Sequence, residues 1–182
     1  MNGEVVVLRY GHRTVRDERI TSHCCLVARA FGAGKIIVEG FEDEELKRTV
    51  GSVNKNWGRG VRLEFTEHWK PVLKKYKKLG YKVVHTTMYG LPLQDNIAKI
   101  RTWKKVLLVI GSQKVEKEVY EMSDMNISIT LQPHSEVAAL AIFLHEYFGR
   151  KELGKIFPGA KLNIMPQKSG KKIEGHKKFS DK

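Results

Sequence analysis

The chain alternates short apolar runs with longer segments that have helical spacing. Residues 5–8 are apolar without interruption, as expected for a strand that is buried on both faces of a sheet. Five further runs, flanked by glycine or by polar residues, have the same character. The predicted strands are residues 5–8, 35–39, 61–65, 81–86, 106–110 and 126–130.

Amphipathic segments lie between these strands and predict helices. Gly32 and Gly34 end the first helix, and Gly80 ends the third, as glycine commonly does at helix C-termini. Strands alternating with helices indicate an α/β fold with a mostly parallel sheet and helices on both faces. The predicted helices are residues 19–31, 41–54, 69–79, 115–122 and 135–148, with a further short helix before residue 106.

The last long helix, residues 135–148, is apolar nearly all round. A helix of this kind is buried on more than one side. In a small domain this predicts a subunit interface in addition to the core. Its apolar residues include Val137, Ala138, Leu140, Ala141, Ile142, Phe143 and Leu144.

The length of 182 residues suits one domain. We expect that domain to span residues 1–165, with a basic, mobile tail over residues 166–182. No apolar run approaches the roughly 18 residues that cross a bilayer, and the start lacks the pattern of a signal peptide. Cys24 and Cys25 are adjacent in a predicted helix, where we expect core packing and no metal site. These features favour a reducing cytoplasm and no membrane contact.

The charge balance predicts an anionic partner. The chain has 33 Lys and Arg against 20 Asp and Glu, which gives a net charge of +13. Nucleic acid is the most common partner of so basic a protein, and the alternative is a basic surface without a ligand. The lysines concentrate on the predicted helix over residues 69–79. The candidate RNA-binding residues are Arg9, Arg13, Lys74, Lys75, Lys77 and Lys78.

An arginine-rich segment joins the first strand to the first helix. Arg9, Arg13, Arg16 and Arg19 fall within it, followed by His23. Ligands of open α/β sheets bind outside the carboxyl ends of the strands, where this segment is expected. Arginine binds phosphate with two parallel hydrogen bonds, so the segment favours a phosphate site. The alternative is a solvated loop with local pairs between arginine and Asp17.

Three further segments follow strand ends. Residues 86–92 contain Thr-Thr-Met-Tyr-Gly, residues 111–114 read Gly-Ser-Gln-Lys, and residues 127–136 contain Thr-Leu-Gln-Pro-His-Ser-Glu. None matches a Walker A loop or a dinucleotide-binding glycine fingerprint. Pro133 is suited to open a helix that His134 or Ser135 caps.

Taken together, these segments resemble the three motifs of the SPOUT superfamily of knotted methyltransferases. The closer resemblance is to the archaeal tRNA (cytidine-56 2′-O)-methyltransferase family, and it covers residues 4–165. It implies a C-terminal trefoil knot, a homodimer and a tRNA substrate. The matching segments are Arg-Asp-x-Arg-Ile-Thr-x-His at 16–23, Ala-Arg-Ala-Phe-Gly-Ala at 28–33, Thr-Met-Tyr-Gly at 87–90 and Gly-Ser-Gln-Lys-Val at 111–115.

The resemblance also implies S-adenosylmethionine held in the knot loops, largely by backbone groups. Met88, Leu91, Ile129 and Leu131 would frame its adenine. The implied cofactor-binding residues are Thr87, Met88, Gly90, Leu91, Ile110, Gly111, Ser112, Gln113, Lys114, Ser128, Ile129, Thr130, Leu131, Pro133, His134 and Ser135.

The catalytic residues implied by the resemblance depart from the pattern of ribose-methylating relatives. Leu26 stands at the position of their first-motif arginine, so the role passes to Arg19 or Arg16, with Asp17 fixing an arginine and His23 close by in the motif. Such an arginine would act mainly as an electrostatic and positioning group. The alternatives are a SPOUT enzyme that methylates a base or another RNA, and a non-catalytic RNA-binding module.

Overall fold

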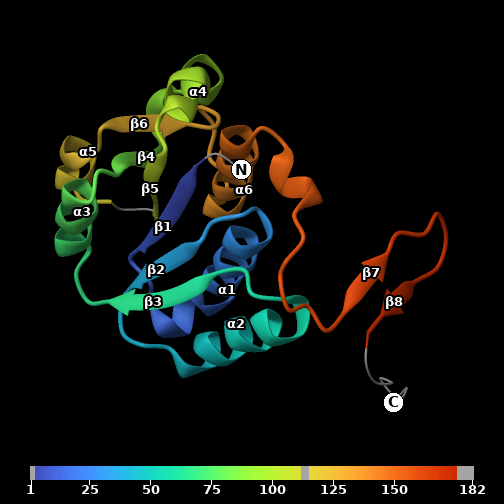
Figure 1. Ribbon diagram of the computed structural model, residues 1–182. Coiled ribbons are helices and arrows are strands. Elements are labelled where there is room, and N and C mark those ends of the chain that lie inside the picture. Colours follow the sequence, from blue (N-terminus) through green and yellow to red (C-terminus); the bar gives the residue numbers. More distant parts are fainter. Residues whose placement is uncertain (1–2, 112–114, 176–182) are drawn as a thin grey trace.

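The computed structural model describes residues 3–111 and 115–175. Within these residues, six parallel strands form one sheet in the order β3-β2-β1-β5-β4-β6 (Figure 1). The strands of this sheet are β1 (Glu4–Tyr10), β2 (Lys35–Glu39), β3 (Arg62–Thr66), β4 (Lys82–Pro92), β5 (Lys105–Gly111) and β6 (Met125–Ser128). The α-helices of the described part are α1 (Thr14–Ala30), α2 (Glu44–Trp57), α3 (Trp69–Lys78), α4 (Leu93–Thr102), α5 (Lys117–Met122) and α6 (Glu136–Phe148).

The central strand β1 is buried on both faces, which explains its unbroken apolar run. Val5 and Val7 contribute to a core with α1, α2, α4 and α6, whereas Val6 and Leu8 contribute to a core with α3 and α5. The predicted α/β fold, with a mostly parallel sheet and helices on both faces, is confirmed. No helix of the described residues is long and apolar enough to cross a membrane.

Helix α1 begins at Thr14, five residues before the predicted start. The carboxylate of Asp17 accepts hydrogen bonds from the backbone N–H and the guanidinium of Arg13 at the N-cap. These bonds satisfy a free donor of the first turn and place an acid where the helix dipole favours it. Most of the predicted arginine-rich loop is therefore helical.

Strand β4 extends to Pro92, although the predicted strand ends at residue 86. After a register shift, Leu91 pairs with Ile127 and Pro92 with Ser128. An ideal Cβ on Gly90 would lie 2.5 Å from the backbone of Ile127. This close approach explains why glycine occupies that position.

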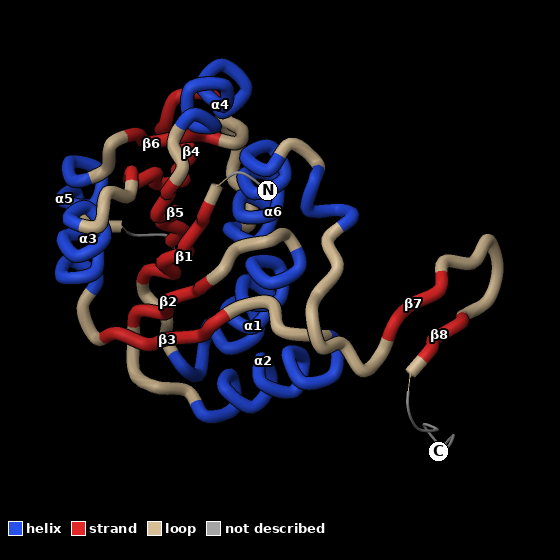
Figure 2. The backbone as a smooth tube through the Cα atoms, viewed as in Figure 1, coloured by secondary structure: helices blue, strands red, loops and turns tan. Residues whose placement is uncertain are grey.

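A short antiparallel hairpin follows the main sheet and extends away from it (Figure 2). It consists of β7 (Asn163–Met165) and β8 (Lys172–Glu174), and a 3-10 helix, η1 (Lys151–Gly154), precedes it. The sequence analysis predicts no strands here. The division after residue 165 stays a prediction, and the hairpin spans it.

Arg29 anchors the segment that leads to this hairpin. Its buried guanidinium donates to the backbone oxygens of Trp57 and Gly58 and lies 4.3 Å from the ring centroid of Phe157. The end of α1 is thereby joined to the end of α2 and to the C-terminal segment.

Candidate active site

A cavity of about 290 Å³ lies beside the middle of β4, at the end of β5 and the start of α6. It opens at the carboxyl edge of the sheet, where open α/β sheets bind their ligands. Two regions far apart in the sequence, one within β4 and one that leads into α6, form most of its wall. The lining residues are His85, Thr86, Thr87, Met88, Tyr89, Gly111, Val115, Tyr120, Ile129, Gln132, Pro133, His134, Glu136 and Ala139.

Six of the expected cofactor-binding residues lie on this wall. They are Thr87, Met88, Gly111, Ile129, Pro133 and His134. Ser112, Gln113 and Lys114 lie outside the described residues. The wall does not include the remaining seven, which are Gly90, Leu91, Ile110, Ser128, Thr130, Leu131 and Ser135.

Several of these seven have structural roles instead. Ile110 and Ser128 are buried at the ends of two strands. Ser135 caps α6 by accepting a hydrogen bond from the backbone N–H of Val137, as its place before the helix predicts. Leu91 and Leu131 are exposed, so they form no apolar slot in this structure.

The sequence analysis missed two aromatic wall residues that contact each other. The rings of His85 and Tyr120 meet edge to face, 4.7 Å apart. The Tyr120 hydroxyl lies 3.2 Å from Oγ1 of Thr87, and Nδ1 of His85 lies 3.0 Å from Oδ1 of Asn126. Burial lowers the pKa of His85, so its ring is neutral at pH 7. A histidine that ends an apolar strand was a detectable signal, whereas Tyr120 carries none.

Arg13 and Asp17 form a bidentate pair at the start of α1. Nε and Nη2 of Arg13 donate to the two carboxylate oxygens of Asp17 at 3.0 and 3.2 Å. Burial raises the pKa of Asp17, but the hydrogen bonds from Arg13 and the charge of Arg9 outweigh it, so the net shift is downward. Asp17 therefore holds Arg13, which is neither of the two arginines, Arg16 and Arg19, to which the resemblance gives the catalytic role.

The structure corrects the expected role of Arg9 in RNA binding. Arg9 is only 1% exposed, because β1 is a central strand and its last residues face the starts of α1 and α6. Its Nη2 donates to Glu136 at 2.9 Å, and its Nη1 donates to the backbone oxygen of Tyr10. Its guanidinium is committed to internal partners and does not reach the surface.

Arg19 and His23 lie in a groove between α1 and α6. The groove also contains Ile20, Ser135, Val137, Ala138 and Ala141, and its floor is mostly apolar. Both Arg19 and His23 are exposed. The groove and the cavity adjoin at the start of α6, because Ser135 lines the former and its two neighbours line the latter. The side chain of Arg16 lies outside the described residues.

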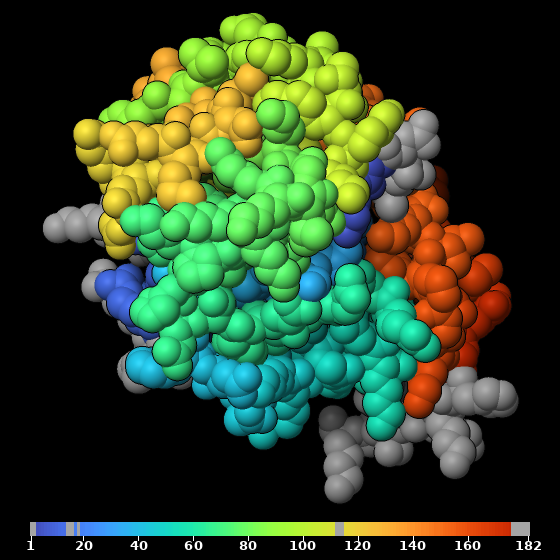
Figure 3. Space-filling view, turned by 60° about the vertical axis from the view of Figure 1, so that its left-hand side comes forward, coloured from blue at the N-terminus to red at the C-terminus, as the bar shows by residue number. Residues whose placement is uncertain are grey.

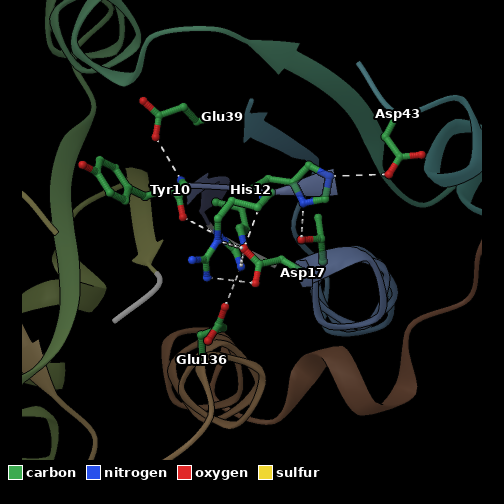
Figure 4. Close-up of polar contacts among 10 residues, drawn as sticks. Tyr10, His12, Asp17, Glu39, Asp43 and Glu136 are labelled. Carbon is green, nitrogen blue, oxygen red and sulfur yellow. Dashed lines mark hydrogen bonds and ion pairs between the residues drawn. The ribbon is translucent and has the colours of Figure 1, made fainter. Parts of the chain in front are cut away.

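A second buried histidine supports the same segment from the other side. Nδ1 of His12 lies 2.9 Å from Oγ1 of Thr21, and Nε2 lies 3.5 Å from Oδ2 of Asp43. Asp43 caps α2 by accepting a hydrogen bond from Leu46. Figure 4 shows His12 between α1 and the turn that carries Asp43. The arginine segment is thus joined to both neighbouring helices.

The predicted lysine surface lies on α3. Lys74, Lys75, Lys77 and Lys78 are all exposed, and Lys77 lies 3.7 Å from Asp124. Figure 3 shows the face of the molecule on which α3 and α5 lie. Helix α3 packs through Trp69, Leu73 and Tyr76, so its lysines are left on the outer side.

This chain is similar to known proteins over most of its length. Residues 57–174 match the family described as "tRNA ribose 2'-O-methyltransferase, aTrm56". The chain belongs to this family. A tRNA (cytidine(56)-2'-O)-methyltransferase of Thermococcus kodakarensis is 48% identical over 177 residues, covering 95% of this chain and 98% of the relative. The corresponding protein of Methanopyrus kandleri is 46% identical over 169 residues, covering 93% and 95%.

Solved structures share the fold. A TrmH/SpoU tRNA modifying enzyme of A. aeolicus superposes with a TM-score of 0.61 at 17% identity, covering 84% of this chain and 77% of that chain. The methyltransferase AviRb of Streptomyces viridochromogenes, in complex with AdoMet, has a TM-score of 0.61 at 16% identity. The match covers 85% of this chain and 60% of AviRb. These structures have the same fold as most of this chain.

The residues that match the family include the cavity wall but not the arginine segment, because the match begins at residue 57.

Proposed function

We propose that this protein transfers a methyl group from S-adenosylmethionine to the ribose 2′-hydroxyl of cytidine 56 in tRNA. The observation that carries the proposal is membership of the tRNA ribose 2′-O-methyltransferase family. The cavity at the carboxyl edge of the sheet supplies a site for this chemistry, and the basic charge of the chain suits an RNA substrate.

The cavity wall fits S-adenosylmethionine in its chemistry. Met88, Val115 and Ile129 provide apolar surface for an adenine, while Tyr120 and Glu136 provide polar groups. An ideal Cβ on Gly111 would lie 2.6 Å from Val115 Cγ2, so glycine lets Val115 pack closely against the end of β5. When bound, this cofactor supplies an electrophilic methyl group on a sulfonium. We propose that the six expected residues on this wall, namely Thr87, Met88, Gly111, Ile129, Pro133 and His134, hold the cofactor.

The nucleophile is a ribose hydroxyl, which is weak until it is oriented and loses its proton. Arg19, or Arg16 beside it, would supply positive charge next to the developing alkoxide and hold a neighbouring phosphate. An arginine guanidinium stays protonated near pH 7, so we assign it an electrostatic role and not that of a general base. His23 lies on the same side of α1 as Arg19, and we include it among the catalytic residues.

We further propose a homodimer that uses the groove between α1 and α6. The groove is lined by Ile20, Val137, Ala138 and Ala141, and Ile142 beside it is 43% exposed. A second copy would cover this apolar surface. Arg19 lies in the groove and not on the wall of the cavity, so the dimer would also decide which cavity this side chain approaches.

We also retain a C-terminal trefoil knot in the proposal. The family resemblance implies this knot, and the pairing of Pro92 with Ser128 brings two of its segments side by side. Lys74, Lys75, Lys77 and Lys78 would contact tRNA phosphates, as would Arg13. A cytoplasmic location is consistent with a tRNA substrate.

The experiment compares two tRNAs that differ in one atom. One carries cytidine at position 56 and the other 2′-deoxycytidine, and both are incubated with labelled S-adenosylmethionine. The proposal predicts label on the first and none on the second. Equal labelling of both would show that the methyl group goes to a base or to another ribose, and would contradict the proposal. Binding of tRNA without any transfer would favour the non-catalytic module.

A further inference from the structure

The guanidinium of Arg9 lies between two carboxylates from different helices. Its Nη2 donates to Oε1 of Glu136 at 2.9 Å and lies 3.9 Å from Oδ2 of Asp17. Figure 4 shows Asp17 and Glu136 converging on this point from α1 and α6. One buried cation therefore serves two anions, and only one of them is within hydrogen-bond distance.

The two carboxylates belong to two different binding features. Glu136 is the only acidic residue on the cavity wall among the described residues. Asp17 holds Arg13, whose side chain is 53% exposed. Through Asp17, Arg9 therefore links Glu136 on the cavity wall to the exposed Arg13.

The surroundings of Arg9 make this link sensitive to charge. Its Nε atom is buried and has no hydrogen-bond partner in the described part of the chain. Charges attract more strongly in such low-dielectric surroundings than in water, and a change at one partner is felt by the others. A cation that enters the cavity near Glu136 competes with Arg9 for that carboxylate, so Arg9 is attracted more to Asp17. Asp17 then holds Arg13 less tightly, and Arg13 becomes available to an RNA phosphate.

We propose that Arg9 is a positioning residue that makes cofactor binding and tRNA binding strengthen each other, through Glu136 on one side and Asp17 on the other. The inference rests on the proposed function, because S-adenosylmethionine brings a positively charged sulfonium into the cavity. The product S-adenosylhomocysteine is a neutral thioether at that atom. It therefore strengthens tRNA binding less, which favours release of methylated tRNA.

The test measures how much each ligand changes the Kd of tRNA, by fluorescence anisotropy at fixed salt. The tRNA carries 2′-deoxycytidine at position 56, so that no methyl transfer occurs during the titration. Saturating S-adenosylmethionine is expected to tighten tRNA binding roughly five- to tenfold, within the range of coupled sites. Saturating S-adenosylhomocysteine is expected to produce a smaller factor.

Two variants interrupt the link at different points. Arg9→Met removes the buried cation, and Glu136→Gln removes the charge on the cavity wall while keeping its size and a hydrogen-bond acceptor. In each variant, S-adenosylmethionine is expected to tighten tRNA binding by a factor close to the one that S-adenosylhomocysteine produces. Arg101→Met is the matched control, because it removes a 3.1 Å pair with Glu146 near the far end of α6. It is expected to keep the wild-type factor.

Three results would overturn the proposal. These are equal factors for the two ligands in the wild type, an unchanged factor in Glu136→Gln, or an equal loss in the Arg101→Met control. If Arg9→Met does not fold, as judged by circular dichroism, Glu136→Gln decides alone. A wild type that binds both ligands and tRNA without coupling leaves the proposed function intact. A wild type that binds neither ligand contradicts the proposed function itself.

Discussion

At the scale of single residues, the site is organised by buried polar groups behind an exposed arginine segment. Arg9 and His12 both lie under the start of α1, and each joins that helix to another element through a carboxylate. Such groups cost free energy to bury, so they persist where their partners hold them in one arrangement. The exposed side chains of Arg13 and Arg19 are thus presented from a fixed support.

Arg19→Ala tests the electrostatic role of this exposed arginine. The loss of one group that stabilises developing negative charge is expected to lower kcat by roughly 10²-fold or more. The Kd of S-adenosylmethionine is expected to stay unchanged, because Arg19 does not line the cavity. Steady-state methyl transfer and calorimetry check the two values. Arg62→Ala, an exposed arginine on β3, is the control, and wild-type kcat in Arg19→Ala would remove Arg19 from the mechanism.

Stability is expected to fall with decreasing pH because of two buried histidines. Burial lowers the pKa of His12, helped by the charge of Arg9, and burial also lowers the pKa of His85. Below about pH 6.5 the unfolded chain therefore binds protons that the native chain does not, so this stability is present above that pH and is lost as the pH falls toward the folded pKa. Each histidine contributes a slope of at most about 1.4 kcal/mol per pH unit.

Urea unfolding between pH 7.5 and pH 5.5 measures this slope. His12→Asn is expected to reduce it, whereas His68→Asn, at an exposed histidine, is expected to leave it unchanged. An identical slope in wild type and His12→Asn would show that His12 does not stay neutral in the folded state.

Sequence reasoning succeeded for residues whose role depends on neighbours in the chain. It predicted Ser135 as a helix cap, and it placed Cys24 and Cys25 in the core, where burial raises the pKa of both thiols to about 12. It assigned Arg9 to RNA because its partner Glu136 lies 127 residues away, and no local pattern reveals that pair.

At the scale of elements, the cavity depends on how closely β4 approaches β6. The pairing beyond Thr86 joins residues that are distant in sequence, which is why the pattern predicts a loop where the structure has a strand. The helix start at Thr14 was missed for a different, local reason, since the Asp17 carboxylate accepts hydrogen bonds from Arg13 that stabilise the first turn.

Two glycine substitutions test this packing. An alanine Cβ at Gly90 would meet the Ile127 backbone, which cannot move aside, whereas one at Gly111 would meet the Cγ2 methyl of Val115, a side chain that can rotate. Gly90→Ala is expected to lower the free energy of unfolding by about 3 kcal/mol and to weaken cofactor binding, as an overpacked core does. Gly111→Ala is expected to cost clearly less stability. Thermal melts and titrations with S-adenosylmethionine check both, and equal losses would contradict the proposed difference.

At the scale of the whole molecule, the alternation of strands and helices was enough to predict the fold class. The excess of lysine and arginine was likewise enough to predict an anionic partner. Neither pattern reveals the hairpin of β7 and β8, whose strands have three residues each and are exposed throughout. The position of the cavity followed from the general rule for parallel sheets.

The lysine surface is expected to contribute to tRNA affinity through counterion release. Replacing Lys74, Lys75 and Lys78 together with alanine is expected to reduce the slope of log K against log salt concentration by about 2 to 3. Filter binding between 50 and about 300 mM salt measures the slope. Replacing Lys47 and Lys55 of α2, which packs on the other face of the sheet, is the control. An unchanged slope in the triple variant would show that tRNA binds to another part of the protein surface.

The central claim is that this chain methylates the ribose of one tRNA cytidine, and one measurement tests it most directly. The protein is incubated with unmodified tRNA and labelled S-adenosylmethionine, and the digested RNA is analysed for the identity and position of the labelled nucleoside. The account predicts 2′-O-methylcytidine at position 56 and no other labelled product. Label in a methylated base, or in a ribose elsewhere in the tRNA, would contradict it.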